Sequence, residues 1–459
     1  MNDLTVRERP EAWHPVPADD QERRLLDVAE SALSEAGRMG TSAAEVSLSH
    51  SSGISVNVRN GEVETVEHNR DKSLGVTVYF GHRSGHASTT DFSRDAVVAC
   101  VEAAGRIARY TEEDPFSGLA DPELLAREMP DLDLYHPWEV DMDTAIDIAR
   151  RCEQAALSAD DRISNTEGGG LSSHHGAALY ANSTGFHGLS RTSNHSISCC
   201  AIAGSGDAMQ RDYWYDKQRD RRKLMDPEAV GEETARRILR RLDARQPGTM
   251  SCPVVFEAPV ASSLLSHLAG AISGAALYRK TSFLTDSLGT ELFRPFVRIH
   301  EQPLLPGAAG SASFDGEGVA TRTRDIVREG VLDSYLLDSY SARKLGMEST
   351  GNAGGVHNLT LESTAGGGLE ALLAQMNHGL LVTELIGFGV NQVTGDYSRG
   401  AFGFLVEGGE IASPVQEMTI AGNLRDMFLA LEAVGSDTDT RRNLRTGSIL
   451  IGNMTVAGG

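Results

Sequence analysis

The spacing of hydrophobic and polar residues alternates between two periods along the first quarter of the chain. Residues 21–37, QERRLLDVAESALSEAG, carry apolar side chains every three or four positions, which predicts an amphipathic helix. Short runs of period two follow in AEVSLSH, SGISVNVRNGEVETVEH and SLGVTVYFGHRSGHAST, and they predict strands with a hairpin turn at Asn60-Gly61. Residues 92–110 return to helical spacing, so this region is predicted to run helix, strand meander, helix.

The same order recurs in the second quarter. Residues 141–160 and 227–244 have helical spacing, and the segment between them reads as a strand meander. Turns are expected there at three glycine-containing sites: 168–170, 182–185 and 204–206. We therefore expect an N-terminal α+β domain over residues 21–245, after a flexible tail of residues 1–20. The repeated order raises the alternative that the domain is a pair of helix–meander–helix units, 21–125 and 138–245.

The chain changes character after a junction at residues 246–253, QPGTMSCP. Glycine becomes frequent, and short apolar runs alternate with turns, which predicts a mainly β domain with tight turns. A hairpin is expected near Glu329-Gly330, a helix over residues 421–435 and a closing strand in GSILIGNMTVAGG. The predicted fold class is α+β: an N-terminal α/β domain of helices and antiparallel meanders, then a glycine-rich, mainly β C-terminal domain (246–459) with a few helices.

Charge narrows the range of partners. The chain has 42 basic and 64 acidic residues, a net charge of −22 that repels phosphate backbones, so no nucleic acid partner is expected. The basic cluster RRILRRLDAR, residues 236–245, is expected to form a solvated helix face. The polar N-terminus lacks the apolar core of a secretory signal, and no apolar stretch is long enough for a membrane span. Together with five cysteines without C-x-x-C spacing, these features predict a cytoplasmic protein with reduced thiols.

Candidate chemistry is sparse when the residues are taken alone. His82 and His86 have metal-like spacing but no evident third ligand, and Ser398 in GDYSRGAFGF has no evident base. His267 lies in the predicted helix SSLLSHLAGAISG without a second histidine one turn later, and no phosphate-binding glycine loop is present. One alternative is a hydrolase with an unrecognised metal site drawn from the histidines at positions 267, 300, 357 and 378.

Several long stretches resemble one peptidase family. They are RKTSFLTDSLG, FDGEGVATRTRDIVREGVLDSYLLDSYSARKLG, STGNAGGVHN, GVNQVTGDYSRGAFGFLVEGGEI and EMTIAGNLRDM. They resemble the PmbA branch, also called TldE, of the TldD/PmbA peptidase family, and the resemblance extends from about residue 20 to the C-terminus. ISCCAIAGSGDAMQRDYWYD and LRTGSILIGNMTVAGG are similar to the same branch.

The resemblance implies a subunit without its own zinc site. The TldD branch carries H-E-x-x-x-H on a helix and a further cysteine ligand near the C-terminus. Matching the shared Leu-Leu and Gly places Ser266, His267 and Ala271 at the histidine, glutamate and histidine positions, and no cysteine follows Cys252. Serine and alanine cannot replace imidazole ligands on zinc. The resemblance therefore implies no catalytic residue, metal or other cofactor in this chain, and zinc in a TldD-type partner.

The resemblance also implies a function and partners. The expected assembly is a TldD–TldE heterodimer that degrades short or unfolded peptides, removes leader peptides and turns over antitoxins, with a homodimer as an alternative when the partner is absent. A different alternative is a binding module that acts on gyrase modulators. The segment Gly395–Gly403 is the expected peptide contact, through main-chain pairing along a strand edge. Asp396, Tyr397, Arg399 and Gly400 are its candidate binding residues, although these side chains could equally brace a turn.

Overall fold

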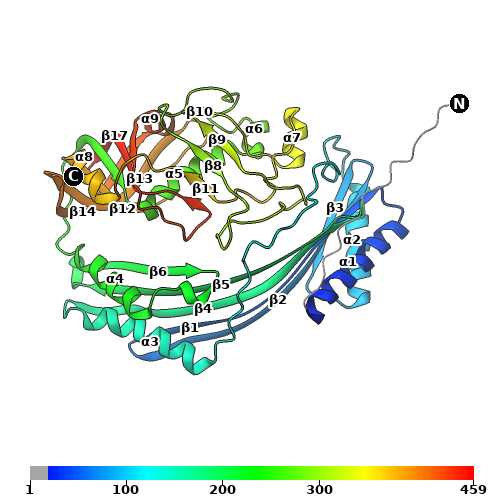
Figure 1. Ribbon diagram of the computed structural model, residues 1–459, viewed down its shortest axis with the longest axis horizontal. Helices are drawn as coiled ribbons and strands as arrows, with labels where there is room; N and C mark the ends of the chain where they lie inside the picture. Colours follow the sequence, from blue (N-terminus) through cyan, green and yellow to red (C-terminus); the bar gives the residue numbers. More distant parts are fainter. Residues whose placement is uncertain (1–18, 459) are drawn as a thin grey trace.

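The computed structural model describes residues 19–458, which form two domains joined near residue 246 (Figure 1). Most of the expected tail, residues 1–18, lies outside the described residues. The first helix, α1 (Asp20–Arg38), begins with Asp19 as its N-cap, whose side chain accepts a hydrogen bond from the backbone N–H of Glu22. No helix in the described range is long and apolar enough to cross a membrane.

A single six-stranded antiparallel sheet forms the body of the N-terminal domain, in the order β3-β2-β1-β4-β5-β6. Its strands are β1 (Ala43–Arg59), β2 (Glu62–Phe80), β3 (Arg83–Thr89), β4 (Ile163–Asn182), β5 (His187–Ala203) and β6 (Gln210–Gln218). The expected hairpin at Asn60-Gly61 is confirmed: both residues have positive φ, 52° and 76°, and Arg59 pairs with Glu62.

The helices α1 and α2 (Arg94–Tyr110) pack near β1, β2 and β3, whereas α3 (Met142–Ser158) and α4 (Pro227–Leu239) pack on the other half of the sheet (Figure 1). The element order helix, three strands, helix thus occurs twice, and β1 pairs with β4 where the two halves meet.

The prediction of a turn at residues 168–170 is wrong, because these glycines lie inside the long strand β4. The register of β4 against β5 shifts between Thr166 and Gly168, which marks a bulge rather than a reversal. A Cβ at Gly169 would lie 2.2 Å from the backbone oxygen of Ala149 on α3. Glycine is needed there because a helix packs directly on the strand, not because the chain turns.

The segment of residues 111–141 connects the two halves of the sheet and lies between the sheet and the C-terminal domain (Figure 1). On one side, the backbone N–H of Ser193 on β5 donates to Leu134 at 2.9 Å. On the other, the N–H of Ala126 donates to Gly318 of the C-terminal domain, also at 2.9 Å. This segment therefore fastens the two domains together.

The C-terminal domain contains a closed β-barrel and a second sheet. The barrel strands are β7 (Met250–Phe256), β12 (Gly379–Ile386), β13 (Asp396–Glu407), β14 (Glu410–Asn423) and β17 (Ile449–Ala457), and pairing of β14 with β17 closes the ring. β15 (Leu431–Val434) extends it beside β17. The second sheet has the order β10 (Val331–Leu332), β9 (Arg324–Arg328), β8 (Ile299–Glu301), β11 (Leu359–Leu361), β16 (Leu444–Arg445).

Short helices accompany these strands: α5 (Ala258–Ala271), α6 (Gly274–Tyr278), α7 (Ser339–Leu345), α8 (Leu369–Met376) and α9 (Leu424–Leu429). The α+β class is confirmed, as is the hairpin at Glu329-Gly330, where both residues have positive φ. The single helix expected over residues 421–435 is wrong: α9 ends at Leu429, and β15 follows because its backbone pairs with β17.

The basic cluster at residues 236–245 is not the solvated helix face that its charge suggested. The side chains of Arg237 and Arg241 are only 7% and 9% exposed, and both lie near the carboxylate of Asp212 on β6. Arg241 also pairs with Glu384 on β12 at 2.6 Å, and its guanidinium lies 3.8 Å from the ring centroid of Phe402. The acidic and aromatic partners come from distant parts of the chain, so Arg237 and Arg241 join the two domains, whereas Arg236 and Arg245 remain exposed.

Candidate functional site

Helix α5 carries the positions that the family resemblance assigns to a zinc motif, and the barrel strand β7 leads directly into it. Leu264, Leu265 and Leu268 bury one face of this helix in the C-terminal core. Ser266 is exposed, His267 is half-buried and Ala271 is fully buried. These three positions therefore have very different surroundings.

The residues at these positions do not fit zinc. A hydroxyl facing solvent, one imidazole and a buried methyl group are not a zinc ligand set. Across residues 19–458, no group of three or more His, Cys, Asp or Glu side chains is arranged to hold a metal ion. All five cysteines are free thiols, and burial raises the pKa of Cys252, which lies on β7 before the helix.

The structure instead brings His267 together with Tyr397 and Arg399 of β13. The rings of His267 and Tyr397 meet edge-on, with their centroids 6.0 Å apart. Burial, followed by the nearby positive charge of Arg399, lowers the pKa of His267, so its ring is neutral at pH 7. Burial raises the pKa of Tyr397, whose side chain is 1% exposed, so its hydroxyl stays protonated.

Each of these three side chains has a buried polar atom without a protein hydrogen-bond partner among the described residues. The atoms are His267 Nε2, the Tyr397 hydroxyl and Arg399 Nε. Gln392 Oε1 and Ser263 Oγ are in the same condition, and Ser263 lies one helical turn before His267. Native proteins pair nearly all buried polar groups, so the cluster of His267, Tyr397, Arg399 and Gln392, the α5–β13 cluster, is the candidate functional site.

The four candidate binding residues of Gly395–Gly403 do not form one surface. Strand alternation places Tyr397 and Arg399 on the side of α5 and turns Asp396 the other way. Asp396 accepts hydrogen bonds from Thr394 Oγ1 at 2.6 Å and Asn423 Nδ2 at 3.3 Å, and these bonds lower its pKa. Gly400 faces Ile386 of β12. Asp396 thus braces a turn, whereas Tyr397 and Arg399 belong to the cluster.

Main-chain pairing of a peptide along this segment is excluded by the strand's position. β13 is an inner strand whose residues Asp396–Gly400 pair with β14 on one side. On the other side, Gly389 and Asn391 bond to the backbone of Ser398 and Asp396, at 2.7 and 2.8 Å. A peptide bound at this place would therefore meet side chains and not a free strand edge.

The other histidines considered as ligands lie apart from one another. Nδ1 of His82 lies 3.0 Å from the oxygen of Ser117, whereas that of His86 lies 3.2 Å from Thr77 Oγ1. His300 lies on β8 beside Glu362, and His378 is exposed before β12. None of these joins His267.

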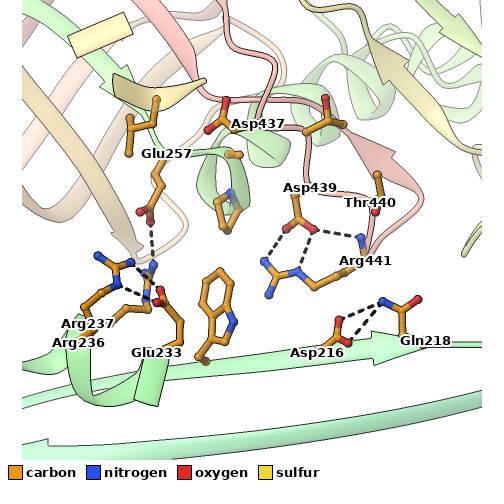
Figure 2. Close-up of a pocket in the computed structure, with 15 residues that line it drawn as sticks. Asp216, Gln218, Glu233, Arg236, Arg237, Glu257, Asp437, Asp439, Thr440 and Arg441 are labelled. Carbon is orange, nitrogen blue, oxygen red and sulfur yellow. Dashed lines mark hydrogen bonds and ion pairs between the residues drawn. The ribbon is translucent and has the colours of Figure 1, made fainter. Parts of the chain in front are cut away.

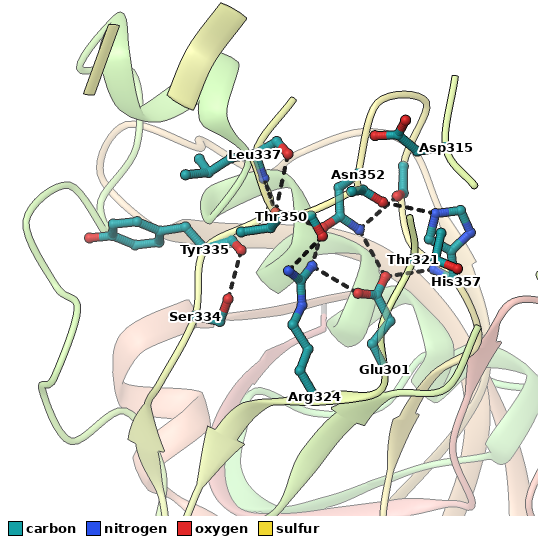
Figure 3. Close-up of polar contacts among 12 residues, drawn as sticks. Glu301, Asp315, Thr321, Arg324, Ser334, Tyr335, Leu337, Thr350, Asn352 and His357 are labelled. Atoms are coloured by element: carbon teal, nitrogen blue, oxygen red, sulfur yellow. Dashed lines mark hydrogen bonds and ion pairs between the residues drawn. The ribbon is translucent and has the colours of Figure 1, made fainter. Parts of the chain in front are cut away.

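His357 belongs to a different buried polar network, built by the motif STGNAGGVHN (Figure 3). Glu301 of β8 accepts hydrogen bonds from Asn352 Nδ2 at 2.9 Å and from the N–H of His357 at 2.7 Å. Its second oxygen pairs with Arg324 at 2.9 Å, and Arg324 also donates to the oxygen of Thr350 at 2.7 Å. This network holds the loop of residues 349–358 against β8.

A cavity of about 380 Å³ lies where α4, β6 and the start of α5 meet (Figure 2). Arg237 donates to Glu257, the N-cap residue of α5, at 3.2 Å, and the indole of Trp214 lies between the guanidinium groups of Arg237 and Arg441. Arg441 pairs with Asp439 at 2.8 Å. Asp216 and Asp437 also line the cavity, and in the described residues their carboxylates accept hydrogen bonds from Gln218 and Ser448 instead of forming ion pairs. The contacts of Arg237 with Glu257 position α5 relative to the N-terminal domain.

Sequence reasoning selected His267, Tyr397 and Arg399 but not their association, and it missed Gln392 and Ser263. Gln392 lies in the β12–β13 loop, and a Cβ at Gly270 of α5 would lie 3.3 Å from its Nε2. The only sequence signal was the placement of polar residues among glycines on each side, which is too general to join two segments far apart in the chain.

Three family models match consecutive parts of the chain. Domain 1, the central domain and the C-terminal domain of the PmbA/TldA metallopeptidases match residues 44–108, 135–242 and 249–458. Metalloprotease PmbA of Escherichia coli O157:H7 is 50% identical over 441 residues, which cover 96% of this chain and 97% of that protein. A PmbA homolog of Haemophilus influenzae is 47% identical over 95% of this chain and 97% of its own length.

Two crystal structures share the whole fold. A proposed DNA gyrase modulator from Bacteroides thetaiotaomicron superposes with a TM-score of 0.91 and 30% identity, over 96% of this chain and 100% of that one. TldE from Thermococcus kodakarensis gives a TM-score of 0.82 with 20% identity, over 94% of this chain and 100% of that one, a likeness of fold.

Proposed function

Because the chain belongs to the PmbA/TldD metallopeptidase family and shares the fold of TldE, we propose that it is the PmbA/TldE-type subunit of a two-chain zinc peptidase. In this proposal zinc and the residues that use it belong to a TldD-type partner in a heterodimer. The observation that carries the proposal is the identity of three residues on α5. Ser266, His267 and Ala271 lie at the positions that hold the zinc motif in the TldD branch.

The structure of α5 supports a role other than metal chemistry. Its leucine face is packed in the core, and its first residue follows Glu257, which Arg237 and Arg240 hold through ion pairs of 3.2 Å each. The helix therefore keeps a defined position between the two domains. In the proposed complex α5 and β13 form part of the wall that contacts a peptide, while the partner performs hydrolysis.

The proposed substrates are short or unfolded peptides, including leader peptides and antitoxins, in the cytoplasm. The α5–β13 cluster supports a peptide ligand, because its unpartnered donors suit the polar groups of an extended chain better than a folded surface. A second candidate function, binding of a gyrase modulator without peptidase activity, is favoured by the description of the Bacteroides structure.

Reconstitution tests this proposal. The chain, a TldD-type chain and their mixture would be assayed with a quenched-fluorescence unfolded peptide, and zinc per chain would be measured by elemental analysis. We expect zinc below about 0.1 per chain in this protein alone, co-elution with the partner and hydrolysis that depends on both chains. Retention of about one zinc per chain, or hydrolysis by this chain alone, would instead support a hydrolase with a metal site of its own.

A partner variant whose zinc-motif glutamate is replaced by glutamine serves as the control, because it should abolish hydrolysis by the mixture while leaving co-elution intact. Absence of co-elution together with binding to a gyrase-modulating protein would favour the second candidate function over the first.

A further inference from the structure

Arg399 is a half-buried cation without a counter-charge among the described residues. Its side chain forms no ion pair or hydrogen bond in residues 19–458, and its Nε atom is buried. Asp396, the nearest acidic residue along β13, faces the other way and is engaged by Thr394 and Asn423. A buried charge is costly unless it is paired, so this arginine calls for an anion.

Among the partly buried arginines of this domain, Arg399 shares the lack of a partner in the described residues with Arg445 on β16, whereas others are paired. Arg324 pairs with Glu301 at 2.9 Å, and Arg441 pairs with Asp439 at 2.8 Å. Arg399 differs because its neighbours toward α5 are the neutral donors Tyr397 and His267. The group as a whole therefore carries one positive charge beside hydrogen-bonding groups that no protein atom uses.

We propose that Arg399, Tyr397 and His267 form a binding site for a carboxylate of a bound peptide. A guanidinium can donate two parallel hydrogen bonds to a carboxylate, and the Tyr397 hydroxyl can donate a third. Oε1 of Gln392 has no partner and can accept a peptide N–H next to the carboxylate. This inference rests on the proposed function, which supplies the peptide.

Part of the site can be reached from solvent, whereas the Tyr397 hydroxyl is buried. His267 and Arg399 are both partly exposed, and Ser266, the neighbour of His267, is exposed. The β12–β13 loop, residues 387–395, lies beside the site and presents Phe388 and Val393, which are 100% and 54% exposed. Exposed apolar side chains next to a carboxylate site suit a peptide with apolar residues before its anionic group.

Two groups of a peptide can supply the carboxylate: its C-terminus or an acidic side chain. Three probe peptides distinguish between them. Isothermal titration of the full-length chain would use Ac-Ala-Leu-Leu with a free carboxylate, the same peptide as its C-terminal amide, and Ac-Ala-Asp-Leu amide. We expect saturable binding of the free acid and at least tenfold weaker binding of its amide. Preferential binding of the Asp peptide would support the same site with the acidic side chain as its source.

Matched variants test the residues. R399Q should weaken binding of the free acid by about ten- to a hundredfold, because a charge-assisted contact is lost. R322Q, which removes an exposed arginine of the same domain, should leave the affinity unchanged. Y397F should weaken binding several-fold while the urea midpoint stays at or above that of the unchanged chain, which guards against loss of fold as the cause.

Equal affinities for the acid and both amides, no binding of any probe, or full affinity in R399Q would overturn the carboxylate site. Each of these results comes from the chain alone. A failure of the proposed two-chain peptidase would appear separately, as absent co-elution or absent hydrolysis in the mixture.

Discussion

The imidazole of His267 on α5 meets the phenol ring of Tyr397 on β13 edge-on, at a centroid distance of 6.0 Å and an interplanar angle of 79°. This contact joins the helix that carries the motif positions to an inner strand of the barrel. Both rings are uncharged at neutral pH, and both have a buried polar atom without a protein partner. Packing therefore holds the pair together, and its polar atoms remain free for a ligand.

Replacing Tyr397 by phenylalanine should leave the free energy of unfolding unchanged or raise it by up to about 1 kcal/mol, because it removes a buried hydroxyl that lacks a partner. Replacement by alanine should lower it by about 3–5 kcal/mol, since a large buried ring is lost. Urea denaturation followed by fluorescence measures both. A large loss in Y397F would show that the hydroxyl is paired in solution.

Replacing Arg237 by alanine should lower the free energy of unfolding by about 3–5 kcal/mol, because Glu257 and Asp212 would keep a buried negative charge without this partner. Arg236 provides the matched control on the same helix: it is 60% exposed and pairs with Glu233, so its replacement by alanine should cost less than about 1 kcal/mol. Thermal denaturation of both variants gives the comparison. Equal losses of stability in the two variants would indicate that Arg237, like Arg236, belongs to a solvated helix face.

Replacing Glu317 by glutamine should stabilise the chain increasingly as pH rises from 5 to 8. Burial, followed by the nearby carboxylates of Asp315 and Asp338, raises the pKa of Glu317 from its usual 4.5 to about 7, although Ser339 donates a hydrogen bond to it. Between these two values the folded chain binds more protons than the unfolded chain, so this carboxyl group's contribution to stability falls as pH rises.

The free energy of unfolding of E317Q should exceed that of the unchanged chain by roughly 2–3 kcal/mol at pH 8, since each pKa unit corresponds to about 1.4 kcal/mol. Urea titrations at pH 5, 6, 7 and 8 would measure it. A constant difference between the two proteins over this range would contradict the expectation.

Replacing Glu301 by glutamine should lower the free energy of unfolding by about 3 kcal/mol, because Arg324 would lose its buried counter-charge (Figure 3). Hydrogen exchange should rise first at the amides of residues 349–358, which this carboxylate fastens to β8. Glu362→Gln removes a carboxylate that is 41% exposed and paired with Arg298, and it should cost less than about 1 kcal/mol. Similar exchange in both variants would count against the network's role.

Local sequence patterns were sufficient to predict many of the helices, strands and turns of this protein and to indicate its family. The Asn60-Gly61 turn, the helix beginning at Pro227 and the closing strand at residues 449–457 each depend on interactions between near neighbours, which the spacing of residues reports directly. The long motifs of the C-terminal half likewise indicated the PmbA branch, which the family models and relatives confirm.

Only the tertiary structure decided how distant residues are paired. Arg237 and Arg241 are buried because Asp212, Glu257 and Glu384 approach from three separate elements. The glycines at 168–170 lie within β4, and α3 packs directly on Gly169. For the same reason Tyr397 and Arg399 join His267, while Asp396 beside them does not. Burial and charge pairing are set by which elements meet in space, and no local pattern contains that information.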